Sequence, residues 1–178
     1  MKNRYSINEI SFLSNRKIFF DANVLIYIFW PTTPDNTKAK NYLNVFSKLL
    51  KNNISMFIYF MVLSEVINRI LKIEYNNITN YEKENFKQFR KSKEGREIIS
   101  TLYTQIKNKI IPNFSITGKI FTKENLENFL ENFSLDFNDN AIVSICKDNN
   151  FILCTDDFDF ANEDIDILTA NPKFFQKR

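Results

Sequence analysis

Acidic side chains are the residues of this sequence whose type and spacing point to chemistry. The 178 residues include no His, so a Ser-His-Asp triad, a Cys-His pair and a His-ligated zinc are excluded within this chain. Only two Gly and four Pro are present, which excludes a collagen-like chain and a Gly-rich phosphate loop. Any catalysis by these residues must therefore rely on carboxylates.

Two of the candidate positions follow short apolar runs. Asp21 ends the run 17–21, and Asp156 and Asp157 follow the run 151–154. Both runs are typical of buried strands in a parallel sheet. Because the carboxyl ends of parallel strands meet at one edge, we expect these acids to lie close together.

Two further acids begin helices that enter from the same edge. Glu65 lies in the first turns of the helix that follows the apolar run 54–59. Asp139 lies in the first turn of a helix that starts at Phe137, for which Asp136 is a plausible N-cap. Asp139 shares its helix face with apolar residues three, four and seven positions later, so we expect it to point toward the sheet. Those apolar residues are Ile142, Val143 and Cys146.

Unneutralised carboxylates at such range repel one another, by about 4 kcal/mol per pair at about 4 Å and an effective dielectric near 20. Either some of them take up protons, or a divalent cation occupies the cluster. Oxygen ligands without His or Cys favour Mg²⁺ or Mn²⁺ over zinc. Such an ion suits phosphodiester hydrolysis, because it activates a bound water and stabilises the charged phosphate.

Each acid also has an ordinary structural explanation. Asp21 can cap the helix that begins near Asn23, and Glu65 can pair with Arg69 one helical turn later. Asp139 can interact with its helix dipole. A polar turn accounts for Asp156, Asp157 and Asp159. Each role is the simpler explanation of one residue, but together they explain poorly why four acids fall at one sheet edge.

The elements that position these acids alternate between strands and helices. This alternation predicts an α/β fold whose parallel sheet is covered on both faces. Strands are predicted at 17–21, 54–59, 151–154 and 165–168, and helices at 23–29, 36–50, 61–76, 81–91, 94–110, from 122 onward and 137–149. In the helix from 122 we expect Leu126, Phe129 and Leu130 to face inward.

Charge is distributed unevenly along the chain. Residues 81–123 hold ten Lys and Arg against four Asp and Glu, and residues 124–166 hold twelve Asp and Glu against one Lys. A polyanion partner on one surface and a cation site on another would explain this, and solvated helix faces are the alternative.

Cysteine usage and hydropathy indicate the compartment. Cys146 and Cys154 lie in apolar contexts and are predicted to be buried thiols of a reducing compartment. The longest apolar run, Val24 to Trp30, is far too short to span a bilayer. We therefore expect a cytoplasmic protein with no membrane partner.

Four segments in order resemble the motifs of the PIN-domain ribonucleases, especially the VapC-type toxins of toxin–antitoxin pairs. They are 20–26 (FDANVLI), 63–66 (LSEV), 139–143 (DNAIV) and 153–160 (LCTDDFDF). No single segment is specific, and the resemblance rests on the ordered set, which spans Lys17 to Leu168.

The resemblance implies one PIN-like domain over 1–178, a three-layer α/β/α sandwich with a short, mainly parallel central sheet. It implies a metal-dependent endoribonuclease that acts on RNA, often as a homodimer, and a small antitoxin partner. By its closing motif it selects Asp157 over Asp156. Asp21, Glu65, Asp139 and Asp157 would then hold Mg²⁺ or Mn²⁺ and orient the attacking water. Asn23 and Thr155 would hold those carboxylates in place by hydrogen bonds, and Asp136 and Asp159 are extra acids nearby, for which an N-cap and a turn role are expected.

The basic helical segment at about 77–120 is longer than a compact toxin of this kind needs. The aromatic rings of Tyr81, Phe86 and Phe89 would offer faces on which RNA bases stack. The alternative is that Phe86 and Phe89 are core residues. The candidate contacts to an RNA backbone are Lys83, Lys87, Arg90, Lys91, Lys93 and Arg96.

Other functions remain compatible with the same acids. A metal-dependent DNA nuclease or phosphatase would keep the carboxylates without a path for single-stranded RNA. A non-catalytic PIN-fold module that binds nucleic acid or protein would keep only the fold. A receiver-type phospho-acceptor would need a lysine after a late strand, and none stands out.

Overall fold

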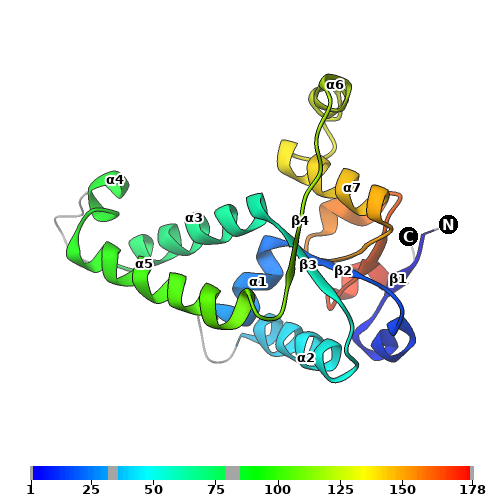
Figure 1. The fold of residues 1–178 in the computed structure, drawn as a ribbon, viewed down its shortest axis with the longest axis horizontal. Coiled ribbons are helices and arrows are strands. Elements are labelled where there is room, and N and C mark those ends of the chain that lie inside the picture. Colours follow the sequence, from blue (N-terminus) through cyan, green and yellow to red (C-terminus); the bar gives the residue numbers. More distant parts are fainter. Residues whose placement is uncertain (1, 32–35, 79–84, 177–178) are drawn as a thin grey trace.

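A parallel β-sheet forms the centre of the molecule. The computed structural model describes residues 2–31, 36–78 and 85–176. Within these residues the sheet has six strands, all parallel, in the order β1-β6-β5-β2-β3-β4 (Figure 1). The strands are β1 (Arg4–Tyr5), β2 (Ile18–Phe20), β3 (Met56–Tyr59), β4 (Ser115–Thr117), β5 (Ile152–Cys154) and β6 (Asp166–Leu168).

Helices cover both faces of this sheet. The chain moves from β2 through β3 to β4 in one direction across the sheet, and then returns to β5 and β6 in the other. Because crossovers between parallel strands are right-handed, the two sets of connections lie on opposite faces. The helices are α1 (Ala22–Phe29), α2 (Thr37–Lys51), α3 (Phe60–Asn77), α4 (Phe86–Phe89), α5 (Lys93–Gln105), α6 (Lys123–Glu131) and α7 (Phe137–Asn149), with 3₁₀ turns η1 (Ile7–Leu13), η3 (Phe158–Asn162) and η4 (Pro172–Phe175) and a π-helical turn η2 (Ile106–Ile110).

The predicted strands are present because both faces of the central strands are covered. All residues of β2 and β5 are buried, as continuous apolar runs predict. The order and type of the predicted helices up to α3 and at α7 are also confirmed, and Asn36 caps α2 through its side chain. The strands β1 and β4 were not predicted, since β1 has two residues and β4 is a largely exposed edge strand without an apolar run.

One prediction about helix α6 is wrong. Leu126 and Leu130 are not core residues but are 40% and 65% exposed, and Phe129 is half-buried against Phe121 and Phe137. Helix α6 contains no buried residue. Figure 1 shows the reason, because α6 stands away from the sheet and contacts α7. An amphipathic pattern predicts a helix with an apolar face, but it does not determine whether the body of the protein covers that face.

Helices α3, α4 and α5 form an extension on the other side of the molecule (Figure 1). The rings of Phe86 and Phe89 pack against Tyr75, with centroids 5.5 and 5.4 Å apart. Gly95 in the first turn of α5 is required here, because a Cβ on it would lie 2.0 Å from the carbonyl oxygen of Phe89. Of the predicted helix over 81–91, the described residues form α4 at Phe86–Phe89, and Tyr81 and Lys83 lie outside the described residues.

Two further predictions concern the cysteines and the hydropathy of the helices. Cys146 and Cys154 are both buried free thiols, as predicted. Among the described helices, none combines the length and the hydropathy that crossing a bilayer requires.

Candidate functional site

Asp21 lies at the point where the chain direction across the sheet reverses. The connection after β2 runs over one face of the sheet and the connection after the neighbouring strand β5 runs over the other, so the carboxyl ends of these two strands form the switch point of the sheet, where ligands of such folds bind. Asp21 is only 4% exposed there and caps α1, with its Oδ1 accepting a hydrogen bond of 2.6 Å from the amide of Ala22. The sequence places an acid at this position, and the topology makes the position the switch point.

Thr155 connects the two strand ends. Its hydroxyl donates to Oδ2 of Asp21 at 2.8 Å, and its oxygen accepts from the amide of Asp157 at 3.0 Å. Burial raises the pKa of Asp21 to about 6, with the charges of Glu65 and Asp157 adding to the rise and the Thr155 hydroxyl opposing it. Asp21, Glu65 and Asp157 are therefore close enough to influence each other electrostatically.

Asp139 joins the same group from helix α7. The pKa of Asp139 is raised to about 8, first by burial and then by the negative charges of Asp136, Asp21, Asp157 and Glu65, in that order. Asp136 is the N-cap of α7, and its Oδ1 accepts from the amide of Asp139 at 2.8 Å. The helix start thus points the Asp139 carboxylate at the strand ends.

Asp156 and Asp157 are adjacent but have different surroundings. Asp156 turns toward helix α2, where its Oδ2 pairs with Nζ of Lys38 at 2.6 Å and its Oδ1 accepts from the hydroxyl of Tyr42 at 3.1 Å. Asp157 contributes instead to the raised pKa values of Asp21 and Asp139. Asp156 is therefore neutralised by its own partners, and Asp157 is the fourth acid of the cluster.

Glu65 is held by a positive charge on its own helix. Nη1 of Arg69 donates to its Oε1 at 3.0 Å, which is the pairing that the spacing allows. Beyond this pair a polar groove of about 300 Å³ follows α3 past Asn68 to Lys72. The sequence analysis did not single out Asn68 or Lys72, although their spacing of three and seven from Glu65 places them on its helix face.

The donor set fits a hard divalent cation, but the ligands are not assembled. Among the described residues, no three acidic or cysteine side chains are arranged so that they could hold one metal ion. The described ion pairs also give no positive partner to Asp21, Asp139 or Asp157. The cluster therefore has uncompensated negative charge and only oxygen ligands, which are the type of ligand that Mg²⁺ and Mn²⁺ prefer. To bind one ion, these side chains would have to move closer together.

The remaining polar candidates are placed differently. Asp159 lies in the first turn of η3, and its amide donates to Oδ1 of the N-cap residue Asp157 at 3.0 Å, which is a turn contact. Asn23 makes no hydrogen bond to the carboxylates within the described part of the chain. It lines a separate cavity with Tyr27, Trp30 and Arg69.

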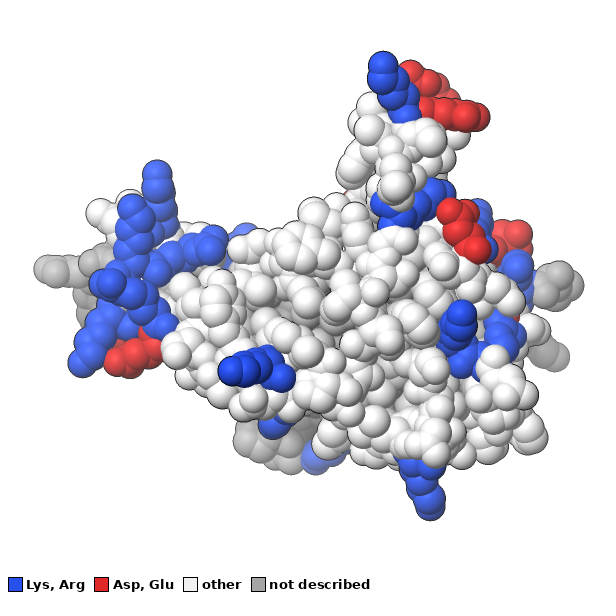
Figure 2. Space-filling view, viewed as in Figure 1, with Lys and Arg blue, Asp and Glu red and all other residues white. Residues whose placement is uncertain are grey.

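The basic candidates lie apart from the carboxylates, at the tip of the α3–α5 extension. Figure 2 shows Lys and Arg side chains gathered at this end of the molecule. Phe89 is buried, so the core explanation holds for its ring. Nη1 of Arg90 lies 3.4 Å from Oδ1 of Asn68, which links the tip to the groove beside Glu65. The exposed candidates within the described residues are Lys87, Arg90, Lys91, Lys93 and Arg96.

Comparison with known proteins supports the fold. No protein-family model and no curated protein sequence matches the chain. The structure of FitAcB from Neisseria gonorrhoeae matches 85% of this chain and 96% of its own, with 14% identity and a TM-score of 0.52. The structure of PAE2754 from Pyrobaculum aerophilum matches 90% of this chain and 88% of its own, with 12% identity and a TM-score of 0.51. At such identities the likeness concerns the fold, which is PIN-like as the sequence predicts.

Proposed function

We propose that this protein is a Mg²⁺- or Mn²⁺-dependent endoribonuclease. One observation supports the proposal: Asp21, Asp157 and Glu65, from three other elements, lie close enough to Asp139 for their charges to raise its pKa. The described ion pairs give a cation to Glu65 but to none of the other three. Packing alone does not require this, because uncompensated buried charge destabilises the fold. A site for a doubly charged cation and a phosphodiester explains it.

The surroundings of each residue suggest its role in the proposed reaction. Asp21, Asp139 and Asp157 would hold the ion, and Glu65 would join them by exchanging Arg69 for the ion. When bound, the ion supplies a water of lowered pKa and positive charge for the phosphate. Thr155 keeps the Asp21 carboxylate fixed, since its hydroxyl donates to Oδ2.

The ordered motifs support a further part of the proposal. We propose that the chain is the toxin of a toxin–antitoxin pair, that a small antitoxin covers its acidic edge, and that two copies associate. Co-expression with the neighbouring reading frame, followed by purification of the complex and its measured mass, tests both the partner and the stoichiometry. A chain that stays monomeric and free of the co-expressed product contradicts this part.

Cleavage of a labelled single-stranded RNA tests the nuclease. Wild type, Asp21→Asn and Asp139→Asn are compared in Mg²⁺, in Mn²⁺ and in EDTA. Asp148→Asn is the matched control, because Asp148 lies on α7 with Asp139 but pairs with Lys119 on the surface. We expect cleavage by wild type and control with either ion, and a loss of at least about 100-fold in both cluster variants.

Parallel arms with duplex DNA and a phosphomonoester separate the enzyme classes. Cleavage that persists in EDTA, or equal cleavage by wild type and Asp139→Asn, contradicts the metal mechanism. Preference for DNA or for the phosphomonoester contradicts the assignment to RNA.

A non-catalytic PIN-fold binding module is the second candidate. It is favoured by the ion pair between Glu65 and Arg69, together with the lack of three assembled ligands within the described chain. Such a module would bind RNA without cleaving it in either metal ion.

A further inference from the structure

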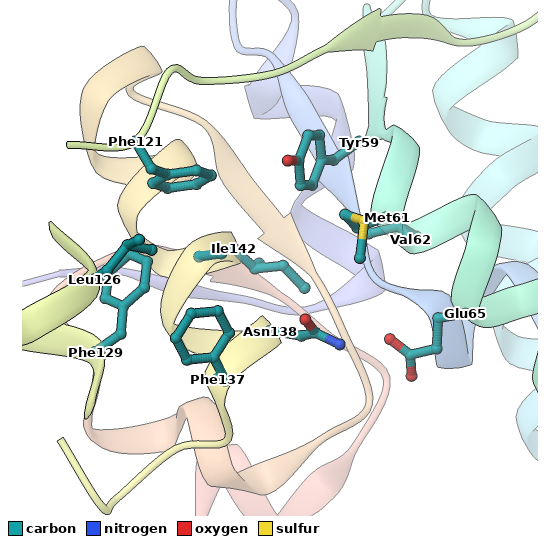
Figure 3. Close-up of a pocket in the computed structure, with 11 residues that line it drawn as sticks. Tyr59, Met61, Val62, Glu65, Phe121, Leu126, Phe129, Phe137, Asn138 and Ile142 are labelled. Atoms are coloured by element: carbon teal, nitrogen blue, oxygen red, sulfur yellow. The ribbon is translucent and has the colours of Figure 1, made fainter. Parts of the chain in front are cut away.

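An apolar pocket opens beside Glu65 and takes no part in the carboxylate cluster. It has a volume of about 180 Å³. Tyr59 and Met61, at the junction of β3 and α3, form one side of it, and Phe121, Phe129 and Phe137 form the other (Figure 3). The pocket thus lies between the body of the protein and the segment that carries α6.

Three aromatic rings make a continuous wall. The ring centroids of Phe121 and Phe129 are 5.6 Å apart with planes at 73°, and those of Phe129 and Phe137 are 5.7 Å apart at 82°. These edge-to-face contacts are favourable arrangements for aromatic rings. An aromatic wall of this kind is suited to a flat ring that enters from outside.

The mouth of the pocket is polar. The amide of Asn138 and the carboxylate of Glu65 lie at the same end and point toward one another (Figure 3). Asn138 precedes Asp139 in the sequence, and Glu65 also lines the polar groove that leads past Arg69 to Lys72. An apolar pocket and a groove with cationic side chains therefore meet at one candidate catalytic residue.

We propose that this pocket binds one nucleobase of the RNA, the base next to the phosphodiester held at the carboxylates. The inference rests on the proposed nuclease function and adds a subsite to it. A base has two apolar faces for the aromatic wall and a polar edge for the amide of Asn138, and its phosphates run along the side of Arg69 and Lys72. This pairing of stacking rings with a cationic track is how proteins hold single strands, whereas a base in a duplex stays stacked and out of reach.

The low charge of the pocket lining favours a neutral occupant. Glu65, at the mouth, is the only charged residue among those that line it, so a neutral group fits the interior better than an ion. An apolar side chain of a protein partner would also be neutral. Continuity with both the carboxylates and the cationic groove favours the base, because only a nucleotide needs all three.

Binding to two labelled probes tests the subsite. The first is a 5′-fluorescein single-stranded RNA of about 12 nucleotides that contains all four bases, and the second is an abasic ribose-phosphate chain of the same length. Fluorescence anisotropy is measured in Mg²⁺ with Asp21→Asn as the background, which separates binding from cleavage. Because stacking contributes roughly 5- to 100-fold per base, we expect the first probe to bind at least about tenfold more tightly.

Variants of the aromatic wall locate the effect. Phe129→Leu and Phe137→Leu keep an apolar side chain but remove the ring, and each is expected to weaken binding of the RNA by about tenfold without changing the abasic probe. Phe133→Leu is the matched control, because Phe133 follows α6, is 93% exposed and does not line the pocket. Circular dichroism checks that each variant is folded. Because there are two ring variants, the test can still be made if one of them fails to fold.

The outcomes are separable from those of the nuclease test. Equal affinity for the two probes, no binding of the RNA, or equal weakening of both probes by the ring variants overturns the subsite. Unchanged RNA binding by both ring variants also overturns it and points to a protein side chain as the occupant. Base-dependent binding without cleavage by wild type would refute the nuclease and leave the subsite standing.

Discussion

Replacing Asp21 by Asn should stabilise the protein at neutral pH while it abolishes cleavage. Burial raises the pKa of Asp21 to about 6, and an ordinary Asp has a pKa near 3.9. A difference of about 2 corresponds to about 3 kcal/mol, at about 1.4 kcal/mol per pKa unit. The ionised Asp21 side chain thus lowers the free energy of unfolding by about 3 kcal/mol.

The sign and the pH window follow from the raised pKa. The folded protein keeps the Asp21 proton to higher pH than the unfolded chain does, so the free energy of unfolding decreases between about pH 4 and pH 6 and is level above that. An Asn at this position does not titrate and can still cap α1. Its single amide oxygen loses one of the two accepted hydrogen bonds, which lowers stability by about 1 kcal/mol at every pH.

Urea denaturation at pH 4 and pH 8 in EDTA measures the effect. Asp21→Asn should be about 1 kcal/mol less stable than wild type at pH 4 and about 2 kcal/mol more stable at pH 8. The change of about 3 kcal/mol between the two pH values is the quantity to test. Asp156→Asn is the matched control at the same sheet edge, and it should lose stability at pH 8 because Lys38 and Tyr42 lose their charged partner.

Parallel stability curves of wild type and Asp21→Asn from pH 4 to pH 8 would refute the reasoning. They would mean that the carboxylate carries no uncompensated charge in the folded protein. The case for a cation site would then lose its physical basis.

Three further predictions concern other parts of the structure. Because the raised pKa of Asp139, about 8, makes its proton compete with a cation, Mn²⁺ affinity measured by calorimetry should rise with pH up to about 8. Asp139→Asn should remove the rise between about pH 6 and pH 8 and leave the part below it that belongs to Asp21; equal slopes above pH 6 would contradict this. Thr155→Val removes the hydroxyl donor to Asp21, so urea denaturation should show a loss of about 1–3 kcal/mol, and an unchanged midpoint would show that the hydroxyl contributes little. Gly95→Ala places a Cβ 2.0 Å from the carbonyl oxygen of Phe89, so thermal unfolding should show a loss of about 1–3 kcal/mol, whereas a neutral result would mean that α5 shifts freely.

The order of the strands and helices around the site is predictable from local sequence. Runs such as 17–21 and 151–154 are short and apolar because strands covered on both faces bury every residue. The acids that follow them must then lie at one edge, since parallel strands end on the same side. The short edge strands β1 and β4 could not be predicted in this way, because partly covered strands of two or three residues do not form an apolar run in the sequence.

The exposed surfaces are less predictable. Leu126 and Leu130 repeat at helical spacing, yet neither is buried, because α6 stands away from the sheet. The aromatic pocket beside Glu65 depends on the same placement, since it brings Phe129 to Phe137. A periodic pattern indicates which residues share a face, and only packing determines what that face meets.

Sequence alone limited the chemistry open to this protein, because in a chain with no His the proposed catalysis must rest on carboxylates. Tertiary structure decided which acids have a cation beside them. The closing motif favours Asp157 over Asp156 by resemblance, and the fold supplies the physical reason, because Lys38, 118 residues earlier in the chain, neutralises Asp156. Contacts between such distant residues arise only when the sheet forms, because they depend on strand order and not on the spacing of neighbours along the chain.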